Sequence, residues 1–531
     1  MYQPTFRKSM AWLHTWAGVV IGSLLFAIFW MGTLSVFDRE IDRWMNPAAR
    51  LTPIAAPLPS GELPIRLDGP VAETAARLGA GSTQYFIRLP TDRMPVVEVR
   101  WRSPGAETFE RRYLHPVSGA VLPHTDTLAG TGFIFPFHYN LHLKWMDLGY
   151  WLVGIAGMAM LLLVVSGVVI HRKIFADFFL FRPRKHLQRA SLDAHNLSGV
   201  LALPFHFLIA LSGLVIFMNI YWPTAPWGAF GQQAKPKEAF QAEAYGSFRR
   251  PKANVPATQP AVSLDELRAR AEQHFGGPAH FVRVWHPGDA NAHVEVRRSA
   301  GDRVTMLVDN VHFDATTGAE LSVKQTSPVM AVQRFISGMH FVQFRHWTLR
   351  WLYFAAGLAG CVLIATGFLF WLEARRASHA KRGLAGVRVV EALTVASVPG
   401  MLAATCAFFC ANRLLPLEAS AFGLQRQGLE MLAFYAVWLA TLLHAAFRDR
   451  AAWRDQSALV AALAVAAVLL NWATTGDHLG RTIGDGLWSV AGMDLLLMVL
   501  AAGATRTAFH LRQSAGPVGV YGARRIEAGH A

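Results

Sequence analysis

Histidine is the residue type whose placement in this sequence could support chemistry. The chain has 21 histidines, and eight lie in or beside its first four apolar segments: His14, His138, His142, His171, His195, His206, His340 and His346. A polar side chain at membrane depth is costly, so a functional role is the default hypothesis for such a group. Within the last four apolar segments His444 stands alone. We therefore interpret the eight as functional together, although any single one could be an ordinary interfacial residue.

The depth of these histidines predicts two layers. His14 and His195 each follow a basic residue by six positions, which is about 9 Å of helix at about 1.5 Å per residue. His142 and His340 lie where the returning helices leave long polar segments. One pair is thus expected near each membrane surface.

Neutral imidazoles on facing helices, without cysteine or carboxylate companions, suit bis-histidine haem b. Zinc usually takes four ligands in a compact set and is less suitable, and the i, i+4 pair His138/His142 is only a weak signal for a single ion. A proton relay stays open as an alternative. His206, His171 and His346 have no matching histidine in the internal repeat described below. We expect these three to be second-rank ligands or hydrogen-bonding partners of a cofactor.

Composition indicates which elements must position these residues. The 531-residue chain is 53% hydrophobic and 16% charged, with a mean hydropathy of +0.28, whereas soluble proteins are about 25% charged. An ordinary soluble enzyme is therefore excluded. About 20 apolar residues span a bilayer, and eight segments qualify: 10–37, 148–170, 196–222, 351–372, 392–412, 431–447, 457–475 and 486–505. We predict a polytopic α-helical membrane protein of about eight transmembrane helices, the first an uncleaved anchor rather than a signal peptide.

The distribution of positive charge predicts the orientation in the lipid bilayer. The net charge is +15, and its excess falls in links and a tail on one side: Arg172, Lys173, Arg182, Arg184, Lys185, Arg189, Arg375, Arg376, Lys381, Arg382, Arg388, Arg448, Arg450, Arg454, Arg506, Arg512, Arg524 and Arg525. By the positive-inside rule this side is cytoplasmic, and so are both termini. The excess then requires no nucleic acid partner.

Two polar segments, 38–141 and 223–339, fall on the opposite, outer side. Alternating runs such as residues 96–101 indicate strands, and Ser263 with Glu266 forms a capping box at the start of a helix. We predict two small α+β periplasmic domains. The other boundaries are expected at 1–37 for the first helix, 142–222 for two helices with a basic link, 340–378 for the fourth helix, 389–505 for an additional four-helix bundle and 506–531 for a cytoplasmic tail. The three cysteines lie in apolar runs and are interpreted as packing residues: Cys361, Cys406 and Cys410.

The first 375 residues repeat one unit of helix, outer domain and helix. His14 and His195 are each followed by glycines at offsets of 4 and 18: Gly18 and Gly32, then Gly199 and Gly213. The returning helices match at a constant offset of 200: Trp151, Gly157, Ser166 and Gly167 against Trp351, Gly357, Thr366 and Gly367. The last four segments show no such pattern.

The motifs around four histidines resemble the PepSY-associated transmembrane-helix family. They are Trp12-Leu-His14-Thr-Trp-Ala-Gly18, Asn140-Leu-His142, Asp193-Ala-His195-Asn-Leu-Ser-Gly199 and Gly338-Met-His340-Phe, and the turn from Phe313 to Leu321 resembles the end of a PepSY module. The resemblance covers residues 1 to about 378. It implies PepSY-like periplasmic domains and, as in some members, two haems b and ferric-siderophore reduction at the inner membrane. It also implies the iron ligands: His14, His142, His195 and His340.

The resemblance further implies that electrons enter from the cytoplasmic side and reduce a ferric siderophore or other ferric chelate outside, releasing Fe(II). Lys144, Arg345 and Arg350 lie beside the outer histidines, where they pair with haem propionates or an anionic chelate, or only snorkel to the interface. No G-x-G-x-x-G follows a predicted strand, so we expect an external donor: quinol, a flavoprotein or an NAD(P)H-dependent protein. The sequence assigns no catalytic side chain.

The four extra segments depart from the shorter members of that family. They contain candidates for an additional site: Asp477, His478, Arg481 and the intramembrane Asp494. Two alternatives remain open for the whole chain. One is a PepSY-domain sensor or peptidase-regulating membrane protein without redox activity, and the other is a transporter. Neither alternative needs a cofactor at the membrane histidines.

Overall fold

The computed structural model describes residues 5–106, 109–171 and 181–514, and its long helices coincide with the predicted membrane spans. Seven spans in the described ranges are long and apolar enough to cross a membrane: α1 (Phe6–Ser35), α5 (Leu148–Ile170), α14 (Trp347–Lys381), α15 with α16 (Gly386–Ser397 and Pro399–Leu414), α17 (Arg426–Arg448), α18 (Ala451–Thr475) and α20 (Trp488–Ser514). The protein is therefore a multi-pass membrane protein. Four basic residues used above to predict its orientation lie outside the described residues: Arg172, Lys173, Arg524 and Arg525.

The eighth predicted span is a broken helix. It consists of α7 (Leu187–Leu201) and α8 (Leu203–Ile216), which are bent by 66° relative to each other. Pro204 occupies the first turn of α8, and proline lacks the N–H group that would continue the helical hydrogen bonding of α7. The count is eight spans when this pair is taken as one.

Strands from both polar segments form a single antiparallel sheet. Its seven strands are β1 (Gln84–Arg88), β2 (Val97–Arg102), β3 (Glu110–Leu114), β4 (Ala279–Trp285), β5 (His293–Arg298), β6 (Asn310–Asp314) and β7 (Glu320–Lys324). Their order is β3-β2-β1-β4-β5-β6-β7. The sequence predicted two separate small domains, whereas β1 pairs with β4, with Phe86 opposite Arg283. This pairing covers two edges that would otherwise expose unpaired backbone groups.

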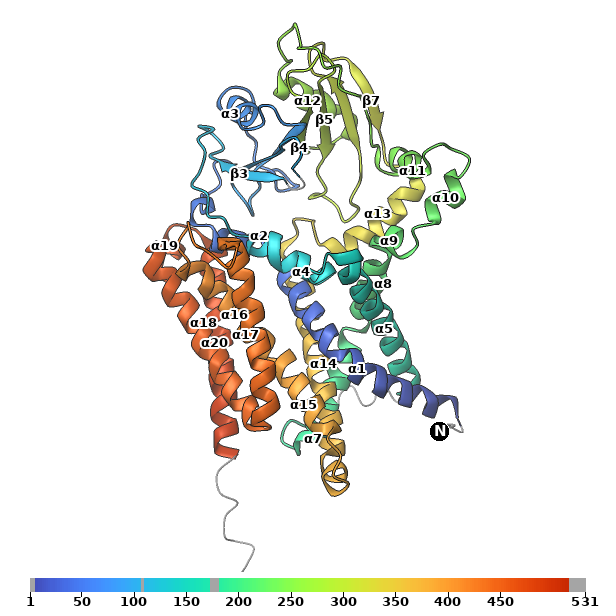
Figure 1. Cartoon of the computed structure of the whole chain (residues 1–531), viewed down its shortest axis with the longest axis vertical. Helices are drawn as coiled ribbons and strands as arrows, with labels where there is room; N and C mark the ends of the chain where they lie inside the picture. The colour runs from blue at the N-terminus through green and yellow to red at the C-terminus, as the bar shows by residue number, and fades with distance from the viewer. Residues whose placement is uncertain (1–4, 107–108, 172–180, 515–531) are drawn as a thin grey trace, which may run out of the picture. The chain divides into compact units, whose positions relative to one another are not determined.

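The two faces of the sheet differ because successive side chains point to opposite sides of a strand. One face is apolar and buried under α3 (Pro70–Leu78) and α12 (Leu264–Phe275), with Ile87, Val282 and Phe313 in its core. The opposite face is charged and carries Arg88, Glu98, Arg100, Arg283, Glu295 and Arg297. Figure 1 shows the sheet beyond one end of α1, α5 and α8, and we call this the sheet-proximal end of these helices.

Short helices connect the spans to the sheet or join neighbouring spans. They are α2 (Asp38–Met45), η1 (Pro47–Ala49), η2 (Gly130–Ile134), α4 (Phe135–Asn140), η3 (Trp145–Asp147), α9 (Met218–Tyr221), α10 (Ala225–Phe230), α11 (Pro236–Tyr245), α13 (Pro328–Phe341) and α19 (Leu479–Gly484). A small hairpin, β8 (Ser420–Ala421) with β9 (Leu424–Gln425), precedes α17.

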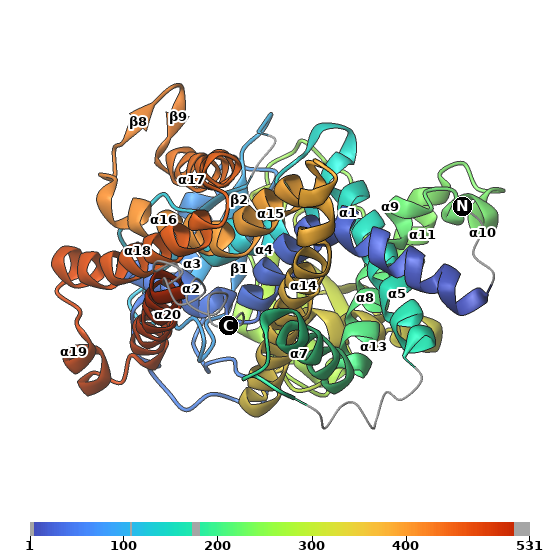
Figure 2. The same ribbon diagram turned by 90° about the horizontal axis from the view of Figure 1, so that it is seen from below.

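The chain divides into two compact units. The first comprises residues 1–367 and 483–490, and the second comprises residues 368–482 and 491–531. Within the first unit the repeat has two halves: α1, α4 and α5 form one, and α7 with α8, α13 and the first part of α14 form the other. Helix α5 packs against both α1 and α8, as the view along the helices shows (Figure 2).

Candidate functional site

Four histidine rings form two pairs, each of which joins the two halves of the repeat. His14 of α1 and His195 of α7 have ring centroids 6.3 Å apart and ring planes at 88°. His138 of α4 and His340 of α13 have centroids 5.8 Å apart and ring planes at 27°. We call these the sheet-distal pair and the sheet-proximal pair. Gly32, which contacts His138, follows His14 by 18 residues on α1, or about 27 Å of helix.

Each ring is held at Nδ1 by a neighbouring helix. Three backbone carbonyls accept from histidine Nδ1–H groups at 2.8 to 2.9 Å: Ile28 from His138, Leu363 from His195 and Ile209 from His340. His14 Nδ1 lies 3.0 Å from Ser166 Oγ. That hydroxyl donates its own hydrogen to the Leu162 carbonyl at 2.7 Å, so His14 is the donor to it. Because Nδ1 carries the hydrogen, Nε2 of each ring keeps the lone pair that binds a metal ion.

A glycine lies under each of the four rings, four residues after the carbonyl that faces the ring. For His14 this carbonyl belongs to Leu163, which also interacts with the ring. A Cβ atom at these glycines would lie 2.6 Å from His138 at Gly32, 2.9 Å from His340 at Gly213, 3.1 Å from His195 at Gly367 and 3.4 Å from His14 at Gly167. The glycines therefore give the rings access to the backbone. Their spacing in the sequence located these glycines but indicated no contact with the histidines.

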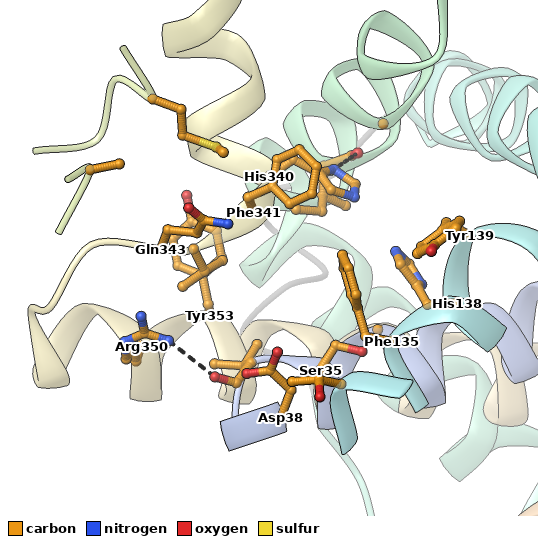
Figure 3. Close-up of a pocket in the computed structure, with 18 of the residues that line it drawn as sticks. Ser35, Asp38, Phe135, His138, Tyr139, His340, Phe341, Gln343, Arg350 and Tyr353 are labelled. Carbon is orange, nitrogen blue, oxygen red and sulfur yellow. Dashed lines mark hydrogen bonds between the residues drawn. The ribbon is translucent and has the colours of Figure 1, made fainter. Parts of the chain in front are cut away.

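The sheet-proximal pair lines a cavity of 610 Å³ that extends from the membrane helices to the charged face of the sheet. The wall of the cavity among the membrane helices is apolar and includes Leu25, Phe29, Ala156 and Leu214. Figure 3 shows His138 and His340 at this wall, with aromatic side chains beside them. A cavity of this size falls in the range of cofactor sites, which is about 300–1,000 Å³.

The wall at the sheet end of the cavity is rich in arginine. The nine arginines are Arg39, Arg88, Arg93, Arg100, Arg297, Arg298, Arg334, Arg345 and Arg350. Most have carboxylate partners. Arg93, for example, donates to Glu40 at 2.7 Å, and although burial raises the pKa of that carboxyl, the charge of Arg93 holds its pKa below the usual value.

Arg350 is one of the exceptions. Its side chain is 2% exposed, and its guanidinium donates to the Val36 carbonyl at 3.1 Å (Figure 3). It also lies over the Phe344 ring, with its Cζ 6.0 Å from the centroid. Within the part of the chain that the structure describes, no carboxylate lies in ion-pairing range of Arg350. A buried charge of this kind is costly until an anion approaches it.

The other two predicted cations lie elsewhere. Arg345 donates to the Asp92 carboxylate at 2.8 Å and to the Leu58 carbonyl at 3.0 Å, so its charge is already paired. Lys144 is exposed. Of the three predicted cations, Arg350 alone combines burial, a position on the cavity wall and the lack of a carboxylate partner.

His142 does not face His340. Its Nε2 makes a hydrogen bond with the Phe133 carbonyl at 2.9 Å, and its ring stacks on Phe133 with centroids 4.9 Å apart. The reason is local: α4 ends at Asn140, and Leu141 and His142 both adopt positive φ angles of 53° and 55°. This turn directs His142 away, and His138, one helical turn earlier, takes the position opposite His340.

The remaining predicted histidines occupy three different positions. His206 is buried in α8, with Nε2 3.3 Å from the Ala356 carbonyl and its ring 5.8 Å from that of Phe29. His171 caps the end of α5, where its backbone N–H donates to the Gly167 carbonyl at 3.2 Å. His346 is exposed before α14 and accepts from the backbone N–H of Leu349 at 3.3 Å. His171 interacts electrostatically with His195 and so lies near the sheet-distal pair, whereas His206 and His346 show no contact with another histidine among the described residues.

The residues that the sequence indicated for an additional site, among the last four spans, make local contacts. Asp477 and Arg481 form an ion pair at 3.6 Å, and His478 Nδ1 accepts from the Arg481 backbone N–H at 3.4 Å. Asp494, buried in α20, accepts from Asn471 of α18 at 3.2 Å. Among the described residues, no group of three or more His, Cys, Asp or Glu side chains is arranged to hold a metal ion.

Comparison with known proteins now identifies the family. The sequence model of the PepSY-associated TM region matches residues 11–374. The chain belongs to this family. The prediction made from the histidine motifs is thereby confirmed. The match of this PepSY-associated membrane protein ends before α15 begins at Gly386.

A relative covers much of the same region. The uncharacterized protein PA4219 of Pseudomonas aeruginosa is 27% identical over 386 residues, which span 69% of this chain and 91% of the relative. The similarity adds no activity, since the relative's name states none.

Proposed function

We propose that this PepSY-associated membrane protein is a haem b reductase of the bacterial inner membrane, with both termini in the cytoplasm and the sheet in the periplasm. In this proposal a quinol, flavoprotein or NAD(P)H-dependent donor is oxidised at the sheet-distal end, and a ferric siderophore or other ferric chelate takes up one electron at the sheet-proximal end. Bound haem would supply the one-electron redox couple. Siderophores hold hard Fe(III) better than Fe(II), so the reduction releases the metal.

The observation that carries the proposal is the arrangement of the two histidine pairs. Two imidazole rings that held one iron ion between them would have their centroids about 6 Å apart. The measured separations are 6.3 and 5.8 Å. The two rings of a pair provide only two ligands, so an ion there needs its other ligands from elsewhere, and a porphyrin provides them.

The cavity at the sheet-proximal pair also suits an amphiphilic group. Its membrane end is apolar and its sheet end carries arginines, which matches a flat apolar ring with two carboxylates at one edge. His138 and His340 would hold the iron, and Arg350 would hold a carboxylate through charge-assisted hydrogen bonds. At the sheet-distal end, His14 and His195 would hold the second iron.

The experiment is a pyridine haemochrome spectrum of the full-length protein, purified after expression with haem supplied. We expect two haems b per chain, reduced by dithionite and reoxidised by ferric chelates. His14→Ala and His340→Ala should each remove about one haem. A colourless protein would contradict the proposal and favour the sensor or transporter alternative. Full haem content in both variants would contradict the assignment of the two pairs.

A further inference from the structure

Two histidines in the sheet are buried with their ring nitrogens poorly satisfied. His293 of β5 and His312 of β6 are 1% and 2% exposed. Within the described part of the chain, none of their four ring nitrogens makes a hydrogen bond of normal geometry, and only weak backbone interactions reach them, from Asn291 to His293 and from Gly246 to His312. A buried polar group left unpaired destabilises the fold, so we expect these nitrogens to bind a ligand. Neither residue lines the cavity of the sheet-proximal pair.

The two rings lie within reach of one ion. Their centroids are 5.7 Å apart and their planes are inclined at 45°. Two imidazole nitrogens at about 2.0 Å from a shared ion place the centroids about 5 to 6 Å apart, depending on the angle at the ion. The register explains the proximity: His293 is opposite Asp314, and His312 is opposite Glu295, so the histidines are diagonal neighbours on one face.

The surroundings keep both rings neutral and shielded. Burial lowers the pKa of His293 to about 4, and burial also lowers the pKa of His312. Both imidazoles are therefore in the unprotonated form that ligates metals at neutral pH. Trp285 stacks on His293 with centroids 5.8 Å apart, and Phe248 contacts both rings, at 5.4 and 5.0 Å.

A segment of the chain covers the two histidine rings. Phe248 belongs to the stretch that follows α11, and this stretch is fixed on both sides of it. The Tyr245 carbonyl accepts from Asn310 at 3.3 Å, and Arg250 pairs with Asp314 at 2.7 Å. Aromatic side chains and an anchored loop thus enclose the two histidines. This enclosure leaves little room for water molecules that could act as further ligands.

The carboxylate opposite His312 in the register is already engaged. Glu295 accepts from Trp285 at 3.1 Å and pairs with Arg283 at 3.4 Å and with Arg297. It therefore does not act as a third ligand, and the two arginines leave the neighbourhood with one net positive charge. This charge opposes a divalent ion more strongly than a monovalent one.

We propose that His293 and His312 bind one cuprous ion in the sheet, at a site separate from the membrane histidines. Copper has a suitable ligand in imidazole. In its monovalent state it is stable with two nitrogen ligands, which matches the two that the sheet provides. The inference does not depend on the proposed reductase function.

The test uses the full-length, haem-loaded protein in detergent, stripped of metal with a chelator. Cuprous ion is supplied with ascorbate and titrated against the coloured Cu(I) chelator bathocuproine disulfonate. We expect one Cu(I) per chain to be withheld from the chelator. His293→Ala and His312→Ala should each weaken the affinity at least tenfold. The matched control is the double variant His115→Ala/His274→Ala, which removes two histidines away from this pair and should bind like the wild type.

Three results would overturn the proposal: no Cu(I) retained by the wild type, equal retention in the His293→Ala and His312→Ala variants, or tight Zn(II) binding at these residues without Cu(I). X-ray absorption at the copper edge of the wild type gives an independent readout if the variants fail to fold. A low-coordinate site of nitrogen ligands supports the assignment, and a site with oxygen or sulfur ligands contradicts it. The haemochrome spectrum of the same samples reports the membrane cofactor separately.

Discussion

The ring of His138 lies so close to the α-carbon of Gly32 that a methyl group there would be 2.6 Å from the imidazole. The contact lets Nδ1 reach the Ile28 carbonyl at 2.9 Å. Gly32→Ala should therefore displace His138 from the sheet-proximal pair. Overpacking of this kind costs about 1–3 kcal/mol, so we expect haem retention at that site to fall about tenfold or more. The measurement is haem content after dialysis against apomyoglobin.

The same helix provides the matched control. A methyl group at Gly18 would meet only the Leu163 side chain at an ordinary 3.8 Å. Gly18→Ala should retain both haems. A graded series is expected at the ring contacts, with Gly167→Ala, at 3.4 Å, the mildest. Equal haem loss in Gly18→Ala and Gly32→Ala would show that the ring contact is not the cause.

Substitution of the two histidines near the end of α4 should separate the sequence-based ligand set from the structural one. His138→Ala removes a member of the sheet-proximal pair and should lower the haem content from two to about one. His142→Ala removes a ring stacked on Phe133 and should leave two haems. Haemochrome spectra of the two purified variants give the answer. The reverse pattern would restore His142 as the ligand.

Arg350→Gln tests the unpaired buried charge. If Arg350 holds a haem carboxylate, the variant loses a charge-assisted interaction of about 1.5–3 kcal/mol. Removal of a nearby positive charge also favours the oxidised, more positive iron, so the midpoint potential of one haem should fall. A redox titration followed at the haem absorption bands measures this. Arg345→Gln is the control, because Arg345 is already paired with Asp92. Equal shifts in both variants would refute the specific role of Arg350.

Glu98 makes the sheet sensitive to acid. Burial raises the pKa of its carboxyl, but the charges of Arg100 and Arg88 outweigh burial and hold the pKa below its usual value. The folded-state pKa is depressed, so the stabilisation is complete above the unfolded value of about 4.3 and is lost as the pH falls through the folded value. Glu98→Gln leaves the partly buried Arg88 and Arg100 without this carboxylate partner and should cost up to about 3 kcal/mol.

Thermal unfolding followed by tryptophan fluorescence checks this prediction. Between about pH 7 and about pH 3, the wild type should lose stability mainly below about pH 4. The Glu98→Gln variant should have a lower stability than the wild type at about pH 7, and its stability should change less over the same pH interval. An exposed acid, Glu110, provides the control substitution Glu110→Gln, for which the curve should follow the wild type. A Glu98→Gln curve parallel to that of the wild type would exclude Glu98 as the source of the acid sensitivity.

The sequence predicted the elements well where the signal was local. The uncharged runs located the long helices. The offset of 18 after His14 and His195 located Gly32 and Gly213, and the offset of 200 between the returning helices located Gly167 and Gly367; these four glycines contact the rings. The break at Pro204 was missed because the apolar run continues through it. His138 was ranked below His142 because the positive φ angles at Leu141 and His142 depend on packing that spacing does not report.

The pairing of β1 with β4 likewise could not be predicted from the sequence. Each strand pattern predicted a small domain, and nothing in the alternation indicates which edge finds a partner. The contact between His293 and His312 follows from the register of β5 with β6, and that register becomes evident only once the strands are aligned.

The union of β1 with β4 has a consequence for the ancestry of the chain. A single half of the repeat would have an open β1 or β4 edge and one histidine of each pair, so alone it would be half of each site. Two copies related by a twofold axis would complete both sites, as in a symmetric dimer. The present chain corresponds to such a dimer with its subunits fused in one polypeptide. Fusion frees the halves to diverge, and His206 in one against Leu25 in the other is an asymmetry that identical subunits could not have.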